Sequence, residues 1–307
     1  MNLDFFQNFC VLEEERNITK AANRLFISRS ALNRQLLQAE EELGQSLFRR
    51  LGNTLSLTQA GEIYLDTARQ VLSAINQGNL LLSDLSTSTR GTFRFGASSS
   101  WCTDILCNVF SSFHEKYPGI SVIPVQKDSA ELNRQLQNGQ LDFAIISSLD
   151  VIPELRIEPL ATFEVLLFAP ETHPMAIKSR ISSSSEYAQC DLSWFQDDCF
   201  CLQGPDSPLH DLLWDIFRKE NFKPKVIIEQ STRELSVEMA RQGVACSFLS
   251  DFLPEHDSGI AKFALSPRLY YSIVLALPED HQISSAEKHF LSCVAQYFGT
   301  ELKMLAD

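Results

Sequence analysis

The sequence has no run of apolar residues long enough to cross a membrane. A spanning helix needs about 20 such residues, and no stretch of the 307-residue chain approaches that length. The amino end, Met1 to Asp4, also lacks the basic segment followed by an apolar segment that marks a signal peptide. We therefore expect a cytoplasmic protein without a membrane partner.

Positive charge is not in excess either. The formal net charge is −13 at pH 7, which argues against a protein that binds nucleic acid over its whole surface. Residues 1–60 hold seven Lys or Arg and seven Asp or Glu, a net of zero, so the excess acid lies in the remainder of the chain. A local basic face near the amino end is compatible with this distribution, whereas a general polyanion binder is not.

Patterns of catalytic and metal-binding residues are missing. No Gly-x-Ser-x-Gly motif surrounds the serines at 98–100, and no His stands in a recognisable partner motif. The six His show no ligand-like pairing, and Cys199 and Cys201 alternate along an expected strand, which points their thiols to opposite faces. We expect no enzymatic activity, no metal and no cofactor.

The eight Cys lack the spacing of a disulfide framework, which agrees with a reducing compartment. The 44% hydrophobic content is ordinary for a globular protein, and 307 residues suffice for two or more domains with sizeable cores. This composition is not that of a disordered chain.

The most informative segment runs from residue 19 to residue 61. Thr19 can cap a first helix that ends near Phe26, and Ser28 can cap a second helix that Gly44 ends. Apolar residues recur on one face of the second helix at spacings of three or four. They are Leu32, Leu36, Ala39 and Leu43. The pattern predicts two short helices joined by a tight connection.

A hairpin is predicted next, where Gly52 and Asn53 separate two arms of alternating apolar residues. Two short helices followed by such a hairpin are typical of a winged helix-turn-helix. In the major groove, Arg, Asn and Gln can reach base edges, and Arg and Ser can reach phosphates. Polar residues also occur on any solvated helix face, but their position between a capped short helix and an Arg-rich turn favours DNA reading. The candidate DNA-contacting residues are Thr19, Ser28, Arg29, Ser30, Asn33, Arg34, Gln38, Arg49, Arg50 and Asn53.

A long helix is predicted from Thr58, its cap, to about Leu85. Its apolar stripe consists of Tyr64, Ala68, Val71, Leu72, Ile75, Leu82 and Leu85. The stripe requires a partner, which is either a second copy of the helix in an antiparallel dimer or the chain's own body. A dimer would fix the distance between two reading heads and predict a roughly palindromic operator. The small and polar residues 83–90 are expected to form a hinge.

From Thr92 on, predicted strands and helices alternate, which implies parallel strands with right-handed crossovers. In open α/β folds, ligands bind beyond the carboxyl ends of the strands, where helix N-termini present free amides. The candidate effector-binding residues at these junctions are Ser98, Ser99, Ser100, Trp101, Asp128, Ser129, Ser147, Gln203, Gly204, Ser247 and Phe248. Hydroxyls and amides suit a small polar or anionic effector, and the two rings suit an apolar part of it. Any single Ser before a helix can instead be a simple N-cap.

The chain resembles the LysR-type transcriptional regulators over nearly its whole length. The matching segments are Thr19-Lys20-Ala21-Ala22, Arg34-Gln35-Leu36, Leu47-Phe48-Arg49-Arg50, Leu57-Thr58-Gln59-Ala60-Gly61, Phe113 to Gly119 and Gly139 to Ala144. The chain has Arg29-Ser30 where the family commonly has Gln-Pro, so its operator need not follow the family's commonest site. It also departs from the family between Gly243 and Ser250, so the identity of the effector cannot be borrowed.

The resemblance implies an α/β protein in which a winged helix-turn-helix and a long linker helix precede an effector domain. That domain would have two subdomains and be built like a periplasmic binding protein. The expected boundaries are 1–58 for the DNA-binding domain, 59–90 for the linker and hinge, and 91–307 for the effector domain. Subdomain I would comprise 92–162 and 268–307, and subdomain II 163–267.

The function that the resemblance implies is sequence-specific regulation of transcription. The partners would be double-stranded DNA, a small-molecule effector, further copies of the chain in a homodimer or homotetramer, and RNA polymerase. Some relatives sense oxidants through thiols, so a cysteine redox sensor is an alternative. Asp197 and Asp198 precede Cys199, which disfavours the reactive thiolate. A solute-binding protein without DNA activity would need a signal peptide and no head, and the sequence fits neither condition.

Overall fold

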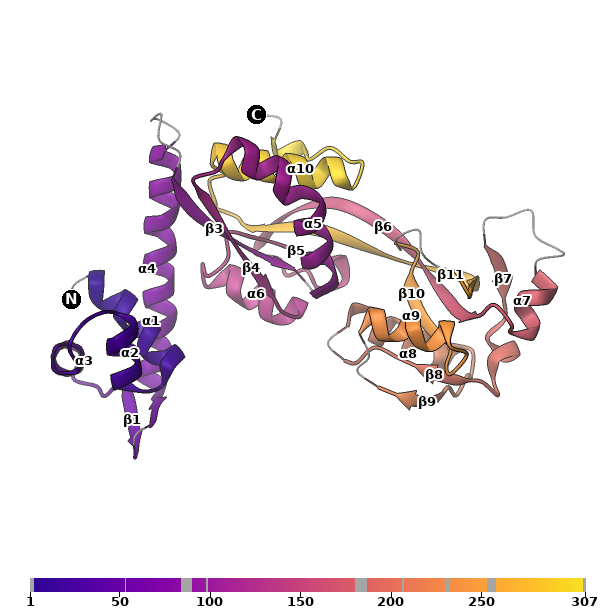
Figure 1. Ribbon diagram of the computed structural model, residues 1–307, viewed down its shortest axis with the longest axis horizontal. Coiled ribbons are helices and arrows are strands. Elements are labelled where there is room, and N and C mark those ends of the chain that lie inside the picture. Colours follow the sequence, from indigo (N-terminus) through magenta and orange to yellow (C-terminus); the bar gives the residue numbers. More distant parts are fainter. Residues whose placement is uncertain are drawn as a thin grey trace.

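A computed structural model describes residues 3–52, 54–83, 90–97, 99–179, 187–205, 207–229, 232–252 and 258–305. The chain forms an amino-terminal head, a long helix beside it and an elongated two-part sensor (Figure 1). The head contains α1 (Leu3–Glu15), α2 (Ile18–Arg24), α3 (Arg29–Leu43) and the antiparallel hairpin β1 (Phe48–Leu51) and β2 (Thr54–Leu57). The long helix is α4 (Gln59–Ser83).

The core of the head joins its elements around aromatic rings of α1. The Phe9 ring lies 5.0 Å from that of Phe48 on the hairpin and 4.8 Å from that of Tyr64 on α4. Phe9 is fully buried, and so is Leu32, which faces it from α3. Because these side chains are packed together, the hairpin and the start of α4 are held in fixed positions relative to α3.

Most of the predicted helix ends are confirmed, and one is wrong. Ser28 caps α3, and Gly44 ends it with a left-handed φ of 65°. The Thr58 hydroxyl accepts from the Gly61 amide at 3.0 Å at the start of α4. Thr19, however, does not cap α2. The Asn17 side chain accepts from the amides of Thr19 and Lys20 instead, since Ile18 already lies inside the helix with its side chain buried.

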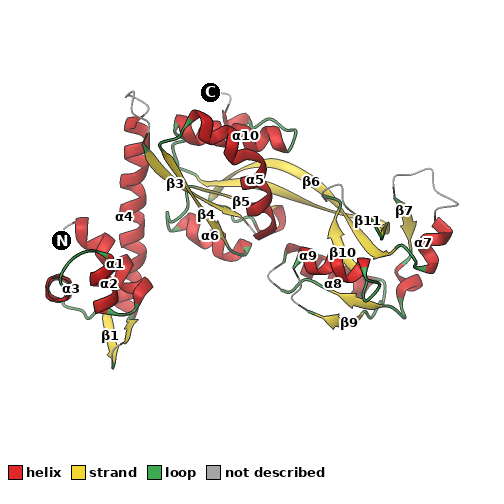
Figure 2. Cartoon of the chain, in the orientation of Figure 1, coloured by secondary structure: helices red, strands yellow, loops and turns green. Residues whose placement is uncertain are grey.

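The near half of the sensor is the βαβαβ unit predicted from the sequence. It contains β3 (Gly91–Ala97), α5 (Ser99–Lys116), β4 (Ile120–Gln126), α6 (Ser129–Gln137) and β5 (Phe143–Ser147). Strand β3 pairs in parallel with both β4 and β5. Helix α5 and the last helix, α10 (Ser285–Tyr297), cover one face of this sheet and α6 covers the other (Figure 2). The core between them contains the fully buried rings of Phe93, Phe113, Phe143 and Phe290.

Two long antiparallel strands, β6 (Leu155–Pro170) and β11 (Ile260–Pro278), run from the near half into the far half (Figure 1). The far half contains α7 (Pro174–Ser179), β7 (Ala188–Cys190), β8 (Cys199–Cys201), α8 (Pro208–Lys219), β9 (Lys225–Ile228), α9 (Arg233–Arg241) and β10 (Ser247–Ser250). Strand order in the large sheet is β10-β6-β11-β5-β3-β4, with β7 beside β11. The pairing of β6 with β11 shifts register between Ala264 and Leu269, which interrupts the ladder near the expected boundary at 267/268.

The long helix contacts both the head and the sensor. Its Tyr64 and Ala68 are buried in the head, and Leu80 is buried against the near half. Strand β3 begins at Gly91, where an added Cβ would lie 2.4 Å from Leu80 Cδ2, so a larger residue would require the Leu80 side chain to shift. The predicted hinge lies largely at residues 84–89, outside the described residues. Within the described part of the chain, no helix is both long and apolar enough to traverse a membrane.

Candidate DNA-reading head and effector cleft

The exposed face of α3 carries most of the predicted reading residues. Arg29, Ser30, Arg34 and Gln38 are exposed, and Asn33 is half-buried. The Ser28 hydroxyl accepts from the Ala31 amide at 3.1 Å and lies 3.1 Å from the Ser30 hydroxyl. The first turn of α3 is therefore capped and fixed, with its Arg and Ser side chains directed to solvent. Gln38 is turned along the helix, where its amide donates to Glu42 Oε1 at 3.0 Å.

Two contacts attach the hairpin to α3. The Arg50 guanidinium donates to Asn33 Oδ1 at 2.8 Å. From the other side, Glu40 Oε1 accepts from the amides of Leu47 and Phe48 at 2.7 and 3.3 Å. Glu40 thus holds the start of the hairpin against α3. Arg49 lies opposite Ser56 on the hairpin and is exposed.

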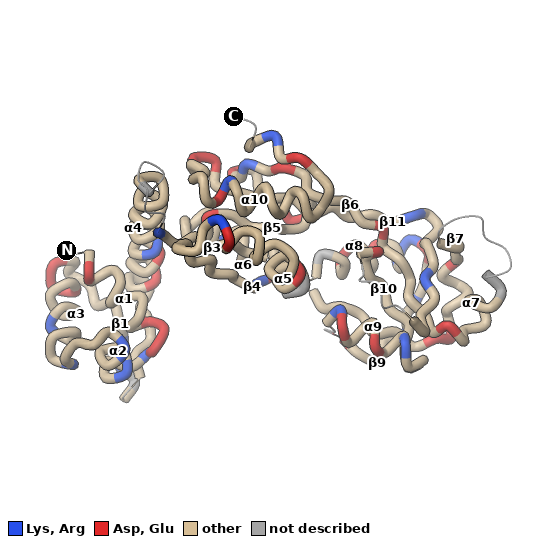
Figure 3. The backbone as a smooth tube through the Cα atoms, turned by 45° about the horizontal axis from the view of Figure 1, so that its top comes forward, with Lys and Arg blue, Asp and Glu red and all other residues tan. Residues whose placement is uncertain are grey.

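Acidic residues of α1 are similarly compensated. Glu14 and Glu15 contact the Arg24 guanidinium at 2.7 and 3.1 Å. Figure 3 shows basic and acidic segments side by side on the head. The Arg side chains of α3 and of the hairpin, Arg29, Arg34 and Arg49, are exposed, which agrees with a local basic face.

One exposed residue of the head was missed by sequence reasoning. Phe26, in the turn between α2 and α3, is 96% exposed and has a positive φ of 54°. The turn is closed by the Ile27 amide, which donates to Ala22 O at 3.0 Å, and by the Phe26 amide, which donates to Asn23 O at 3.2 Å. Gly is the usual residue at such a helix end. Nothing in the sequence pattern distinguishes Phe26 from a core residue, because neighbouring Leu25 and Ile27 pack inward.

Thr19 and Asn53 complete the predicted DNA-contacting set. Thr19 is exposed in the first turn of α2. Asn53, at the tip of the hairpin, lies outside the described residues.

The predicted effector residues converge only in part. A hollow of about 360 Å³ lies between the near and far halves of the sensor, and Asp128 and Ser129 at the start of α6 line it. Leu149 and Asp150 line it from the turn after β5, and Ser207 from the start of α8. We call this hollow the interlobe cleft.

Three further predicted residues adjoin the interlobe cleft without lining it. The Ser147 hydroxyl accepts from the amide of Leu149 at 3.2 Å. Gln203 Oε1 accepts from the Ser207 hydroxyl, and the Gly204 carbonyl accepts from the Ser207 amide at 2.9 Å. Their hydrogen bonds hold Leu149 and Ser207, which line the interlobe cleft, in position.

Trp101, Ser247 and Phe248 do not reach the interlobe cleft. Trp101 is 7% exposed and stacks on Phe163 with ring centroids 5.1 Å apart. Phe248 stacks on Phe200 at 5.7 Å inside the far half, and the fully buried Ser247 hydroxyl donates to Ser236 O at 3.4 Å. Ligands in open α/β folds bind beyond the ends of strands, and this rule predicts where in the chain a site lies. It does not predict which of the side chains there are buried in the core instead. Ser98 lies outside the described residues, and of Ser99 and Ser100 only the backbone, at the start of α5, is described.

The interlobe cleft is lined by acidic residues. Four of its described lining residues are carboxylates, Asp128, Asp150, Asp211 and Asp215, and none is Lys or Arg. The Asp128 carboxylate caps α6 by accepting from the Glu131 amide at 2.8 Å, and Asp215 accepts from the Arg218 guanidinium. The negative lining differs from the expectation of an anionic effector, because an anion there would meet carboxylates without a lining cation.

Three cysteines of the far half, Cys190, Cys201 and Cys246, are buried, and Cys199 is half-buried. The Cys246 amide donates to Cys199 O at 2.7 Å, and the Cys201 amide donates to Cys246 O at 2.9 Å. Burial, together with the nearby charges of Asp191 at Cys190 and Asp198 at Cys246, raises the pKa of the two thiols to about 12. These thiols therefore stay protonated at neutral pH and are poor nucleophiles.

Comparison with protein families gives two matches that together cover most of the chain. Residues 3–62 match the family described as bacterial regulatory helix-turn-helix protein, lysR family. Residues 86–299 match the LysR substrate binding domain. The HTH-type transcriptional regulator YybE of Bacillus subtilis is 26% identical over 297 residues, which cover 96% of this chain and 98% of YybE. AlsR of the same organism is 24% identical and covers 81% of this chain and 80% of its own.

Solved structures share the fold over almost the full length. A full-length OxyR variant from Pseudomonas aeruginosa has a TM-score of 0.70 at 19% identity and covers 97% of both chains. The regulator CbnR in complex with its target DNA has a TM-score of 0.66 at 17% identity and covers 96% of this chain and 99% of its own.

Proposed function

The chain belongs to the LysR family of transcriptional regulators, and from this premise we propose which of its residues read DNA and which bind the effector. Its function is sequence-specific DNA binding that regulates transcription under control of a small-molecule effector in the carboxyl-terminal domain. The observation that carries the residue assignment is the capped first turn of α3, with Arg29, Ser30 and Arg34 exposed beside a hairpin that Arg50 ties to Asn33.

In this proposal the first turn of α3 enters the major groove. Arg29, Asn33 and Arg34 read base edges, while Ser28, Ser30 and the hairpin Arg49 contact phosphates. The contact of Arg50 with Asn33 sets the orientation of the amide, so that Asn33 presents its NH₂ group outward. Thr19, Gln38 and Asn53 stay at the edge of the footprint. Phe26 adds an apolar contact to a sugar or to a thymine methyl group.

A homodimer built on α4 would bring two heads to one operator. Val71, Ile75, Gly78 and Leu82 lie at spacings of three and four, and thus on one face of α4. Ile75 is 36% exposed and Leu82 63% exposed. An added Cβ on Gly78 would meet nothing within 4 Å, so packing within the chain does not require Gly there, although Gly weakens a helix by about 1 kcal/mol relative to Ala. A small residue on an apolar stripe favours close approach of a second helix.

The effector is proposed to bind in the interlobe cleft, against Asp128 and Ser129. The acidic lining favours a cationic or neutral polar molecule over an anion. Because the two halves are joined by β6 and β11, a ligand that contacts both can favour one arrangement, and a preference of about 1 to 3 kcal/mol is enough for allosteric control. Assembly to a tetramer, contact with RNA polymerase and a cytoplasmic location extend this proposal.

A cysteine redox sensor is the weaker alternative. The OxyR relatives have the same fold, but the raised thiol pKa values of Cys190 and Cys246 disfavour oxidation by the thiolate route. A variant with Cys199→Ser and Cys201→Ser should keep its operator binding and its response to metabolites. Loss of an oxidant response alone in this variant would favour the alternative.

The DNA-reading assignment can be tested by selection of bound fragments from genomic DNA. Wild-type protein should enrich a few promoter fragments over random duplex. Arg34→Ala should weaken binding to them by roughly 1 to 3 kcal/mol if Arg34 contacts a base. Arg24→Ala is a matched control because it removes the same charge from a residue already paired with Glu14 and Glu15. Equal affinity of wild type and Arg34→Ala at fixed salt would remove Arg34 from the reading set.

A further inference from the structure

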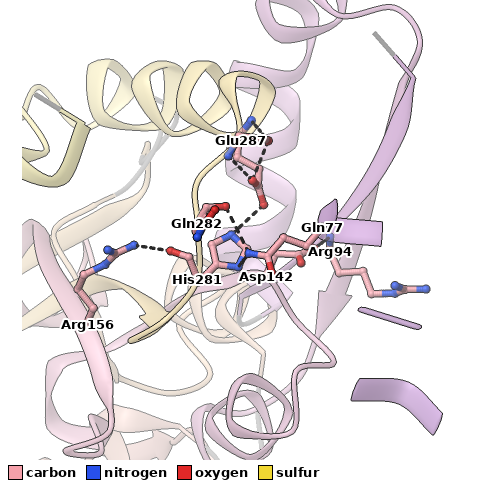
Figure 4. Close-up of polar contacts among 8 residues, drawn as sticks. Gln77, Arg94, Asp142, Arg156, His281, Gln282 and Glu287 are labelled. Atoms are coloured by element: carbon pink, nitrogen blue, oxygen red, sulfur yellow. Dashed lines mark hydrogen bonds and ion pairs between the residues drawn. The ribbon is translucent and has the colours of Figure 1, made fainter. Parts of the chain in front are cut away.

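A buried cluster of three titratable residues lies where α4 meets the sensor. Asp142 precedes β5, His281 follows β11, and Glu287 is in the first turn of α10. Their exposed fractions are 7%, 8% and 1%. Each offers one ligand atom, and these atoms all lie within 4.8 Å of one another. Figure 4 shows the three side chains converging from separate elements.

Each of the three residues is oriented by a second partner. Gln77 of α4 donates its amide to His281 Nδ1 at 3.0 Å. The Ser284 amide and hydroxyl donate to Glu287 Oε2 at 2.8 and 2.7 Å. The Arg94 amide donates to Asp142 Oδ2 at 2.6 Å. Partners of this kind fix the direction of metal ligands in known sites.

The inner atoms of the cluster face one another. His281 Nε2 lies 3.1 Å from Glu287 Oε1. With the Gln77 amide donating to Nδ1, Nε2 is the nitrogen that donates to the Glu287 carboxylate. The Arg156 guanidinium nearby donates to the His281 carbonyl at 3.2 Å, not to a carboxylate.

Two carboxyl side chains of this cluster, Asp142 and Glu287, are thus enclosed in the protein interior. A cation bound between them would offset the cost of burying negative charge.

We propose that Asp142, His281 and Glu287 bind one divalent transition-metal ion of the Zn²⁺ class. One imidazole and two carboxylates are a suitable set for Zn²⁺, with a fourth position for water. Ligands of a tetrahedral zinc ion lie about 3.3 Å apart, so the His281–Glu287 pair already has the required separation. The Asp142 carboxylate lies within 4.8 Å of the other two ligand atoms and has to move closer when the ion binds.

Binding of the ion changes the contact between α4 and the sensor. When Nε2 ligates the metal, the imidazole proton moves from Nε2 to Nδ1, with no net proton release. Nδ1 then donates, so Gln77 must turn its carbonyl oxygen toward it. Gln77 Nε2 also donates to Gln282 O at 3.3 Å, and that bond is lost in the turned position. Occupancy of the site therefore alters how the helix that carries the head is held.

Acidic residues next to His281 in the chain line an open hollow. Glu279 and Asp280 immediately precede His281, and together with Glu154 they line an open hollow of about 560 Å³. Three carboxylates at this surface would raise the local concentration of divalent ions.

The site can be tested by zinc titration of full-length protein after dialysis against a chelator. A chromophoric chelator competes for ZnCl₂, and Co²⁺ serves as a probe with visible absorption bands. Wild type should bind one equivalent tightly. His281→Gln and Glu287→Gln should each lower the affinity at least 100-fold, and Gln77→Leu should lower it about 10-fold, because outer partners contribute 10- to 100-fold. Glu287→Gln keeps a residue that can complete the capping box of α10, so its fold is preserved.

His210→Gln is the matched control, because it removes an imidazole outside the cluster, one that is hydrogen-bonded to the exposed Asp211 at 2.8 Å. It should bind Zn²⁺ like wild type. The proposal is wrong if wild type, His281→Gln and Glu287→Gln bind zinc with equal affinity. It is also wrong if Cys107→Ser, and not these two variants, loses zinc binding. The zinc titrations are carried out without DNA, so their outcome does not depend on which residues read the operator.

Discussion

At the scale of single residues, Phe26 stands out in the head because its backbone conformation is unfavourable for a bulky residue and its side chain is exposed. A bulky residue with a left-handed φ costs about 1 kcal/mol relative to Gly, and its 96% exposed ring recovers nothing from packing within the chain. It precedes the N-cap of α3 by two residues. A residue that is both strained and exposed beside the reading helix is best explained by a contact that forms only on DNA.

Replacement of Phe26 by Gly separates these two effects. Phe26→Gly should raise the free energy of unfolding by about 1 kcal/mol, because the left-handed conformation is no longer strained. The same variant should bind its operator more weakly, by roughly 1 kcal/mol, because an apolar contact is lost. Urea unfolding and operator titration at fixed salt measure the two quantities.

Phe26→Asn provides the control, since Asn tolerates the left-handed region while keeping a side chain. If both variants are stabilised and bind DNA as tightly as wild type, Phe26 is merely tolerated in the turn and has no role on the operator.

At the scale of elements, the sequence predicted which segments form helices and strands better than it predicted their ends. Periodic burial fixes the type of an element, so α3, α4 and the βαβαβ unit follow from their apolar spacing. Ends depend on which of several capping residues is used. Asn17 and Thr19 are both good caps, and the burial of Ile18 between them, which decides in favour of Asn17, is a tertiary property.

The effector residues were harder to predict for the same reason. Asp128 and Ser129 reach the interlobe cleft because the N-terminus of α6 points there. Trp101 and Phe248 start from equivalent positions, yet their rings are taken up by the core. A one-dimensional pattern shows where a strand ends but not which neighbours have already filled the space beside it.

Dimerisation through helix α4 should be lost when a charged residue is introduced at the centre of its exposed apolar stripe. Ile75→Glu places a carboxylate on the face that contains Gly78 and Leu82, and burial of that charge in a dimer would be strongly unfavourable. We expect the variant to sediment as a monomer at concentrations at which wild type is a dimer or larger. Asn76→Glu adds the same charge about 100° around the helix from Ile75, on a different face, and should leave the assembly unchanged. An Ile75→Glu protein that assembles like wild type would mean that α4 dimerises by another face.

The buried thiols of Cys190 and Cys246 should be protected from alkylation. A folded-state pKa of about 12 for Cys190 and Cys246 leaves about one part in ten thousand as thiolate at pH 8. The exposed Cys107 should therefore react with iodoacetamide at pH 8 within minutes. Cys190 and Cys246 should react at a comparable rate only in urea. Mass spectrometry of the labelled peptides gives the result, and rapid labelling of Cys190 in the folded protein would contradict it.

The same thiols make a pH-dependent contribution to stability. Their pKa is raised in the folded state, so the contribution is fully present below pH 9 and is lost as pH rises from 9 toward 12. Each thiol should lower the free energy of unfolding by about 1.4 kcal/mol per pH unit in that window. Urea unfolding at pH 8 and pH 10 should show a smaller loss for Cys190→Ala than for wild type. An identical loss would indicate that the buried thiol does not resist ionisation.

At the scale of the whole molecule, control of transcription depends on how the sensor halves are arranged. The interlobe cleft has walls from α6 on one side and α8 on the other, and the two halves are continuous only through β6 and β11 in the sheet (Figure 1). A ligand in the cleft can therefore bias the halves directly. Its effect must then pass through α4, which is packed on β3 by Leu80 and bonded to the near half by Gln140, whose amide donates to Asp66 at 3.2 Å.

The charge of the cleft predicts the charge of the effector. A metabolite extract can be divided by ion exchange, and the fraction retained by a cation exchanger, which contains positively charged molecules, should change operator affinity. The anionic fraction should have no effect, because an anion would face Asp128, Asp150 and Asp211 without a lining cation.

Ser129→Trp should abolish the response by filling the cleft, while operator binding without effector stays as in wild type. Glu154→Trp, at the other hollow, should respond normally. Activity in the anionic fraction alone, or a full response of Ser129→Trp, would place the effector elsewhere in the sensor.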